Sequence, residues 1–239
     1  MKHAVSGSSF SDGLSLSYRN VKIKAVNNDG LITANRDENS KGHINICKAL
    51  RGFFKDYFLL FFIFIILPMV IAVLSDSHSS KILVETQIRI TTLIAFLYFA
   101  SKLMSDDNKK YHAAEHMTAN AIEHNCSVID FDKINSAPMV HVRCGSNIFV
   151  LMFLVFCILT VLLVPPMNFF ERFFLELLIL YVSFSITVLI VSIPAISYIF
   201  SVPGLIIQRI CFLKKPDDTH INTALAAANL LMAIVKPKI

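Results

Sequence analysis

The chain has 239 residues, of which 55% are hydrophobic and only 16% are charged. Soluble globular proteins carry about 25% charged residues, and the mean hydropathy of +0.62 excludes a protein whose whole surface faces water. The net charge of +5 comes from scattered Lys and Arg residues without the clustering or the motifs of nucleic-acid-binding proteins, so no nucleic-acid partner is expected.

Residues 1–56 are polar and basic, and they are expected to form an N-terminal segment with a small β-hairpin element. Apolar and polar residues alternate in 14–18 and again in 21–26, which is the two-residue period of half-buried strands. Asn27-Asn-Asp-Gly30 is a turn signal, and the apolar pattern resumes at Leu31.

The apolar segments that follow predict a mainly α-helical, polytopic membrane protein with about four membrane-spanning helices. The expected spans are 57–74, 88–104, 147–164 and 173–200. They define a transmembrane helical domain, 57–204, which contains the polar segment 105–146. The remaining residues, 205–239, form a C-terminal segment with a helix that begins near Pro216-Asp-Asp-Thr219.

The distribution of basic residues predicts the orientation in the membrane. An even number of spans places 1–56, 105–146 and 205–239 on one side, and these segments hold nearly all the Lys and Arg. The positive-inside rule then puts both termini in the cytoplasm of a multi-pass membrane protein. The five cysteines are irregularly spaced and do not resemble a disulfide framework, in keeping with a reducing compartment.

A His/Glu motif follows the second predicted span. On a helix, His112, Glu115, His116 and Glu123 lie along one stripe. The order H-x-x-E-H is that of the inverzincin metalloproteases. We therefore expect His112 and His116 to bind a divalent transition metal, with zinc as one candidate, and Glu115 to act as a general base or as a group that orients the ligands. The alternative interpretation is a solvated polar face.

A second motif, His141-Val-Arg-Cys144, directly precedes the third predicted span. A His and a Cys three residues apart can contribute to a metal site. The alternative is that Arg143 anchors the chain at the membrane interface and that Cys144 is a small buried residue. Because both motifs border spans on the same predicted side, they could converge, and Glu123, His141 and Cys144 are the candidates for a third metal ligand.

Taken together, these motifs resemble those of the YqhQ-like family of bacterial membrane proteins. The matching segments are Tyr111-His-Ala-Ala-Glu-His116 with Glu123, His141-Val-Arg-Cys-Gly-Ser146, and Pro216-Asp-Asp before an Ala-rich helix. The resemblance implies a metal-dependent enzyme of the bacterial inner membrane without an established reaction. Ala113, Met117, Val142 and Asn222 stand where the family usually has Gly, Lys, Pro and Glu, and a divergent or inactive member is the alternative.

The first expectation for function is a metal-dependent, hydrolase-like enzyme at the cytoplasmic membrane face. Its substrate would be a lipid-linked molecule or a membrane-protein segment. The alternative is a non-catalytic membrane scaffold or assembly factor. In it, the His/Glu stripe holds a structural metal or makes interhelical hydrogen bonds, and the polar loop and residues 205–239 dock a partner. A transporter is less well supported, because the predicted spans contain few ionisable residues and no inverted repeat. The sequence does not specify the oligomeric state.

Overall fold

The computed structural model describes residues 5–18, 21–37, 78–124, 129–164 and 169–235. Backbone contacts divide the chain into two compact units. The first, which we call the α/β unit, comprises Met1–His43, Ser101–Asn147 and Leu205–Ile239. The second, the helical unit, comprises Ile44–Ala100 and Ile148–Gly204. Each unit is therefore assembled from segments that lie far apart in the sequence.

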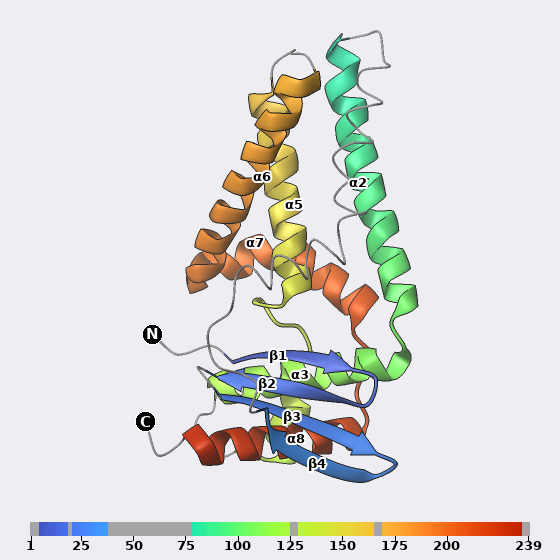
Figure 1. Cartoon of the computed structure of the whole chain (residues 1–239), viewed down its shortest axis with the longest axis vertical. Coiled ribbons are helices and arrows are strands. Elements are labelled where there is room, and N and C mark those ends of the chain that lie inside the picture. Colours follow the sequence, from blue (N-terminus) through green and yellow to red (C-terminus); the bar gives the residue numbers. More distant parts are fainter. Residues whose placement is uncertain (1–4, 19–20, 38–77, 125–128, 165–168, 236–239) are drawn as a thin grey trace. The chain divides into compact units, whose positions relative to one another are not determined.

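The N-terminal strands of the α/β unit form one antiparallel sheet in the order β1-β2-β3-β4, as Figure 1 shows. The strands are β1 (Ser6–Phe10), β2 (Gly13–Tyr18), β3 (Val21–Asn28) and β4 (Leu31–Arg36). The turn after β3 places Asp29 and Gly30 at positive φ, as the Asn-Asp-Gly sequence predicts. The expected strands are confirmed in β2, β3 and β4, whereas β1 was missed because its Ser-rich sequence has no apolar alternation.

Two helices, α3 (Asp106–His124) and α8 (Asp218–Val235), pack against this sheet (Figure 1). Helix α3 contacts β1 and β2, and α8 contacts β2, β3 and β4. Leu14 pairs with Ala25, and Leu16 pairs with Ile23, so these four buried side chains share the face of the sheet that the helices cover. Buried alanines of both helices allow the backbones to approach closely. They are Ala114, Ala119, Ala121, Ala224, Ala227 and Ala228.

The start of α8 agrees with the sequence prediction. The helix begins at Asp218, and the Asp217 carboxylate accepts a 3.3 Å hydrogen bond from the backbone N–H of His220. This is the usual role of an Asp at a helix N-terminus. A shorter helix, α4 (Phe131–Ser136), is capped in the same way, since the Asp130 carboxylate accepts a 2.9 Å hydrogen bond from the backbone N–H of Lys133.

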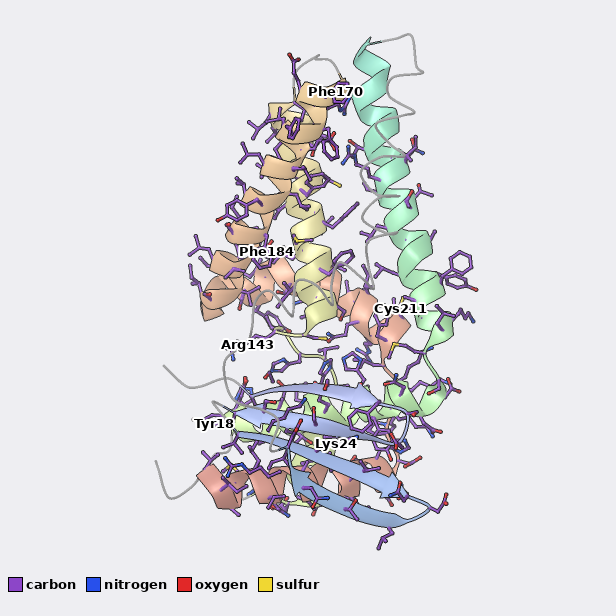
Figure 2. All side chains as sticks on the ribbon, in the orientation of Figure 1. Tyr18, Lys24, Arg143, Phe170, Phe184 and Cys211 are labelled. Atoms are coloured by element: carbon purple, nitrogen blue, oxygen red, sulfur yellow. The ribbon has the colours of Figure 1, made fainter. Side chains whose placement is uncertain are left out.

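The helical unit contains α6 (Phe169–Ser192) and most of three further helices, α2 (His78–Leu103), α5 (Gly145–Leu163) and α7 (Pro194–Ile207). The chain continues from α7 into a π-helical turn, η1 (Gln208–Phe212), which belongs to the α/β unit. Phe170 and Phe184, labelled in Figure 2, are exposed on α6. Apolar side chains that project from a helix in this way suit a surface in contact with lipid.

Two helices of the described chain, α5 and α6, are each long and apolar enough to cross a membrane. This observation supports membrane association and corrects the prediction of four spans. The expected span 57–74 lies outside the described residues. Most of the expected span 88–104 lies in α2, which counts as a candidate span only if it is taken together with α3 as one bent pair. The expected span 173–200 ends early, at Ser192, because Pro194 begins the next helix.

Arg89 is buried rather than directed to water, with only 1% of its surface exposed. Its Nη2 atom lies 2.9 Å from both carboxylate oxygens of Glu176 on α6, which is 0% exposed. The Nε atom of Arg172 donates a further 3.0 Å hydrogen bond to Glu176, and the Arg89 guanidinium lies 5.1 Å from the centre of the Phe156 ring. The positive charge of Arg89 is therefore paired with Glu176 inside the helical unit.

Candidate metal centre

The predicted His/Glu stripe lies on α3. Glu123 Oε1 accepts a 3.3 Å hydrogen bond from the backbone N–H of Val5, immediately before β1. Glu115, two turns earlier, lies against Gly7 of the same strand. The stripe therefore lies along β1, the edge strand of the sheet. Its members share one side of α3 because residues three and four apart on a helix are neighbours.

Two histidines of α3 and a cysteine form a compact set of potential metal ligands. One donor atom from each of His112, His116 and Cys144 can be chosen so that all lie within 4.8 Å of one another. The Sγ atom of Cys144 is 3.4 Å from Nε2 of His112, and the centres of the His112 and His116 rings are 4.4 Å apart. Among the predicted candidates for a third ligand, Cys144 is the one that the fold brings to both histidines.

The orientation of His116 leaves one ring nitrogen free to bind a metal. Its Nδ1 atom lies 2.8 Å from the carbonyl oxygen of Met139, and a carbonyl oxygen can only accept, so Nδ1 carries the proton. In the neutral ring, Nε2 then holds the lone pair. A histidine that ligates a metal usually donates its other N–H in this way, which fixes the tautomer and the ring plane.

The loop that contains Met139 and Cys144 is held by two amide side chains. Asn120 of α3 donates hydrogen bonds of 2.8 and 3.0 Å to the carbonyl oxygens of Pro138 and Val140. Gln208, at the start of η1, accepts a 2.9 Å hydrogen bond from the backbone N–H of His141. Segments from three parts of the sequence therefore determine where Cys144 lies.

Glu123 and His141, the other predicted ligand candidates, interact with each other. Oε2 of Glu123 lies 3.7 Å from Nε2 of His141, and its Oε1 lies 3.2 Å from Nη1 of Arg143. Arg143 is labelled in Figure 2 on the loop before α5. Partial burial opposes ionisation, but the interactions with His141 and Arg143 keep the pKa of Glu123 below its usual value. Glu123 is therefore an anion that already has cationic or polar partners.

His141 connects this pair to the metal-ligand cluster. Its ring centre is 5.8 Å from that of His116, and its side chain is buried. Because its Nε2 faces Glu123, His141 is placed to orient its neighbours, with Glu123 in turn orienting it. Carboxylate–histidine contacts of this kind commonly support metal ligands from outside the coordination sphere.

Glu115, the predicted general base, is buried directly beneath β1. A Cβ atom at Gly7 would lie 2.7 Å from both Cγ and Oε1 of Glu115, so glycine is what allows the strand to cross this side chain. Oε2 is buried and has no hydrogen-bond partner within the part of the chain that the structure describes. Burial raises the pKa of Glu115 to about 8, so the carboxyl group is largely protonated near neutral pH.

Burial also determines the protonation of the potential ligands. It lowers the pKa of His112 to about 4. The pKa of His116 is also lowered well below its usual value, by burial and by the neighbouring imidazoles of His112 and His141. Burial raises the pKa of the Cys144 thiol. In the absence of metal, the site therefore holds two neutral imidazoles and a protonated thiol, with no charge to balance.

The separation of Cys144 and His112 suits two ligands of a tetrahedral transition-metal ion. Zn–N bonds of about 2.0 Å and Zn–S bonds of about 2.3 Å place tetrahedral nitrogen and sulfur ligands about 3.5 Å apart. The Sγ–Nε2 distance of 3.4 Å between Cys144 and His112 matches this separation. The Nδ1 atom of His112 is buried and has no hydrogen-bond partner among the described residues.

Sequence reasoning missed several residues that position the site. Asn120, Gln208 and Gly7 had no recognisable signal, because each acts on a segment that is distant in the sequence. Asn147 was also missed, although it acts locally: its side chain donates a 2.5 Å hydrogen bond to the carbonyl oxygen of Val142, five residues earlier. Burial of an amide side chain is informative only after the fold is known.

Comparison with known proteins assigns the chain to a family but to no described activity. No curated protein and no solved structure matches it significantly. The family described as "Protein of unknown function (DUF1385)" matches residues 14–234. That match includes α3, the loop before α5 and α8, and therefore every residue of the ligand cluster. The chain belongs to the DUF1385 family of proteins of unknown function.

Proposed function

We propose that this protein is a metal-dependent enzyme of the membrane, with hydrolase-like chemistry at the membrane surface. The observation that carries the proposal is the set of donor atoms on His112, His116 and Cys144, which lie within 4.8 Å of one another. The orientation of His116 by the Met139 carbonyl supports it, because a metal-bound histidine usually donates its other ring N–H to a group of this kind.

Three protein ligands favour catalysis over a purely structural role, because a tetrahedral ion then keeps one position for water or substrate. A bound divalent metal would supply Lewis acidity and would lower the pKa of a water molecule. Glu115 is the residue placed to hold or move a proton there, and its Oε2 atom has no other described partner. Glu115 is also close enough to Cys144 for its charge to help raise the pKa of that thiol.

Glu123 and His141 would act as positioning residues in this proposal. The carboxylate of Glu123 faces His141, and the His141 ring lies beside His116. His141 is not part of the group formed by His112, His116 and Cys144. Its contribution would be to orient and polarise the neighbouring His116 ring. This assignment retains every predicted site residue and separates the ligands from the groups that support them.

We infer the location from composition. Helices α5 and α6 would span the membrane, and the basic segments at both ends and in 105–146 favour a cytoplasmic position for the α/β unit by the positive-inside rule. A substrate that reaches this site would then be a lipid-linked molecule or a membrane-protein segment presented at the cytoplasmic interface.

Elemental analysis of detergent-purified protein tests the proposal directly. We expect about one transition-metal ion per chain in the wild type, retention in Glu115→Gln, and loss in His116→Ala and Cys144→Ala. His124→Ala is the matched control, because His124 is an exposed residue at the end of the same helix. The measurement also identifies the metal, since copper can bind a His/His/Cys set as well as zinc. A folded wild type without metal would contradict the proposal.

A second candidate is a non-catalytic scaffold with a structural metal. The burial of the cluster favours it, because His116 is only 3% exposed and Glu115 only 7%. Substitution with Co²⁺ separates the two functions. An open coordination position should let added azide or cyanide change the visible spectrum, whereas a closed structural site should not respond. Loss of the thiolate-to-cobalt absorption in Cys144→Ala would identify the sulfur ligand in both cases.

A further inference from the structure

A cavity of about 360 Å³ opens beside the candidate metal centre in the α/β unit. Met117 of α3 and the loop residues Pro138 and Met139 line one part of it, and Arg209 and Lys215 line another. None of the three potential metal ligands is among its lining residues. The cavity is therefore distinct from the candidate metal centre. Its volume falls in the range of small-molecule pockets, about 300–1,000 Å³.

No carboxylate among the described residues neutralises the cationic part of the cavity. Within that part of the chain, Arg209 and Lys215 form no ion pair, and the lining residues include no Asp or Glu. The neighbouring lysines differ in this respect. Lys214 pairs with Asp106 at 2.5 Å, and Lys110 pairs with Asp217 at 3.2 Å. Two positive side chains that share a concave surface raise the local concentration of anions.

The remaining described lining of the cavity is mainly apolar, with Asn135 as the polar exception. The apolar residues are Met117, Ala137, Pro138, Met139 and Val140, and methionine side chains adapt to irregular apolar ligands. Near Arg209 in the chain, Ile206 and Ile210 are 54% and 75% exposed. Exposed apolar side chains next to cations are characteristic of surfaces that lie at a lipid headgroup layer.

The position of Arg209 depends on an irregular helix. Arg209 lies in η1, the π-helical turn that follows α7, directly after Gln208, which holds the His141 backbone. π-Helical turns are uncommon and occur frequently at functional sites. The same turn therefore supports the ligand loop with one side chain and presents a cation to the cavity with the next.

We propose that this cavity binds a phosphate-bearing group, with Arg209 and Lys215 as its ligands and the methionine wall in contact with the adjoining apolar part. Arg pairs with phosphate oxygens in a bidentate manner, and Lys acts as a point charge. The group could belong to an anionic lipid or to a soluble phosphate compound. This proposal does not depend on the metal centre or on the enzymatic function proposed above.

Binding is measured on the full-length chain in a phosphate-free, non-ionic detergent by titration calorimetry. The protein is first treated with a chelator, because phosphate also binds metal ions. The test therefore gives the same information whether or not the protein binds a metal. The probes are phosphatidic acid in mixed micelles, diacylglycerol as its phosphate-free counterpart, glycerol 3-phosphate and inorganic phosphate. We expect phosphatidic acid to bind and diacylglycerol to bind much more weakly.

Two double variants identify the site. Arg209→Gln/Lys215→Gln should weaken phosphatidic acid binding by about tenfold or more. Lys22→Gln/Lys24→Gln removes the same charge from the sheet of the same unit and should leave binding near the wild-type value. If inorganic phosphate or glycerol 3-phosphate binds as tightly as the lipid and with the same dependence on Arg209 and Lys215, the phosphate site is supported with a soluble ligand.

Two outcomes would overturn the proposal. One is equal affinity for phosphatidic acid and diacylglycerol in the wild type, without binding of either soluble phosphate. The other is an equal loss of affinity in the two double variants, which would show that only net charge matters. Circular dichroism and the elution volume of each variant establish that the chain is folded before binding is compared.

Discussion

The side-chain oxygen of Gln208 lies 2.9 Å from the backbone nitrogen of His141 and accepts its hydrogen bond, although 67 residues separate the two in the sequence. The Nε2 atom of Gln208 also lies 3.4 Å from the hydroxyl oxygen of Ser146, and that hydroxyl lies 3.2 Å from the sulfur of Cys144. A single, fully buried amide therefore supports both ends of the loop that carries Cys144.

Replacing Gln208 should weaken metal binding without removing a ligand. We expect Gln208→Ala to lower metal affinity by about tenfold, a size typical for groups that orient metal ligands. Gln208→Glu keeps the acceptor for the His141 N–H and should retain more of the affinity. The measurement is competition with a chromophoric chelator, with Gln87→Ala, an exposed glutamine on α2, as the control. Unchanged affinity in Gln208→Ala would show that the loop holds itself in place.

Gly7 should not tolerate a side chain. A Cβ atom there would lie 2.6 Å from the carbonyl oxygen of Ser15 and 2.7 Å from Glu115, and backbone oxygen cannot move as freely as a flexible side chain. We expect Gly7→Ala to destabilise the protein by about 1–3 kcal/mol, the usual cost of overpacking. Gly145→Ala is the control, since no atom lies within 4 Å of its added Cβ. Equal thermal stability of the two variants would contradict this packing.

Metal binding should release about one proton per ion near pH 7.5. The two imidazoles are already neutral, because burial lowers the pKa of His112 to about 4 and lowers that of His116 as well. The Cys144 thiol has a raised pKa and must lose its proton to become a ligand. Titration calorimetry in buffers with different ionisation enthalpies measures the release. Cys144→Ala should abolish it, whereas release of two or more protons would point to ligands other than these three.

Glu115 should make the metal-free protein less stable as the pH rises. Its pKa of about 8 lies above the usual 4.5, so folding favours the protonated form. The contribution of Glu115 to stability is therefore fully present below pH 4.5 and is lost as the pH rises through 8. We expect Glu115→Gln, which stays neutral, to unfold at a progressively higher temperature than the wild type between pH 5 and pH 8.5.

The comparison of Glu115→Gln with the wild type is needed because His112 acts in the opposite direction. Its lowered pKa of about 4 contributes stability above pH 6.5 that is lost as the pH falls. Subtracting the two unfolding profiles removes this common term. A difference between the two proteins that stays constant with pH would contradict the burial of Glu115.

Removing Glu176 alone should strongly destabilise the helical unit. Glu176→Leu leaves Arg89 buried without the carboxylate that contacts it at 2.9 Å, and breaking such a pair typically costs about 3–5 kcal/mol. Arg89→Leu/Glu176→Leu removes both charges and should recover part of the loss. Thermal unfolding in detergent tests this order of stability, with Glu171→Gln on the exposed side of the same helix as the control. A double variant less stable than Glu176→Leu would reverse the expectation.

Local pattern was sufficient for much of the fold and for part of the site. The alternation in 14–26 specified β2 and β3, and the turn sequence before Leu31 specified the hairpin, because side chains in a strand alternate between two faces. The apolar runs identified α5 and α6 in the same way. By contrast, β1 has no such pattern, and it forms a strand because it pairs with β2 from Ser6 to Phe10.

The spacing of His112 and His116 by itself determined that two imidazoles share one side of α3, since residues four apart on a helix are neighbours. The third ligand was undetermined among Glu123, His141 and Cys144, because nothing local relates α3 to a loop about 20–30 residues away. The tertiary structure decided which of these three side chains lies beside both histidines. Hydrogen bonds from Asn120 and to Gln208 hold the loop so that Cys144 meets the histidines while Glu123 and His141 pair with each other.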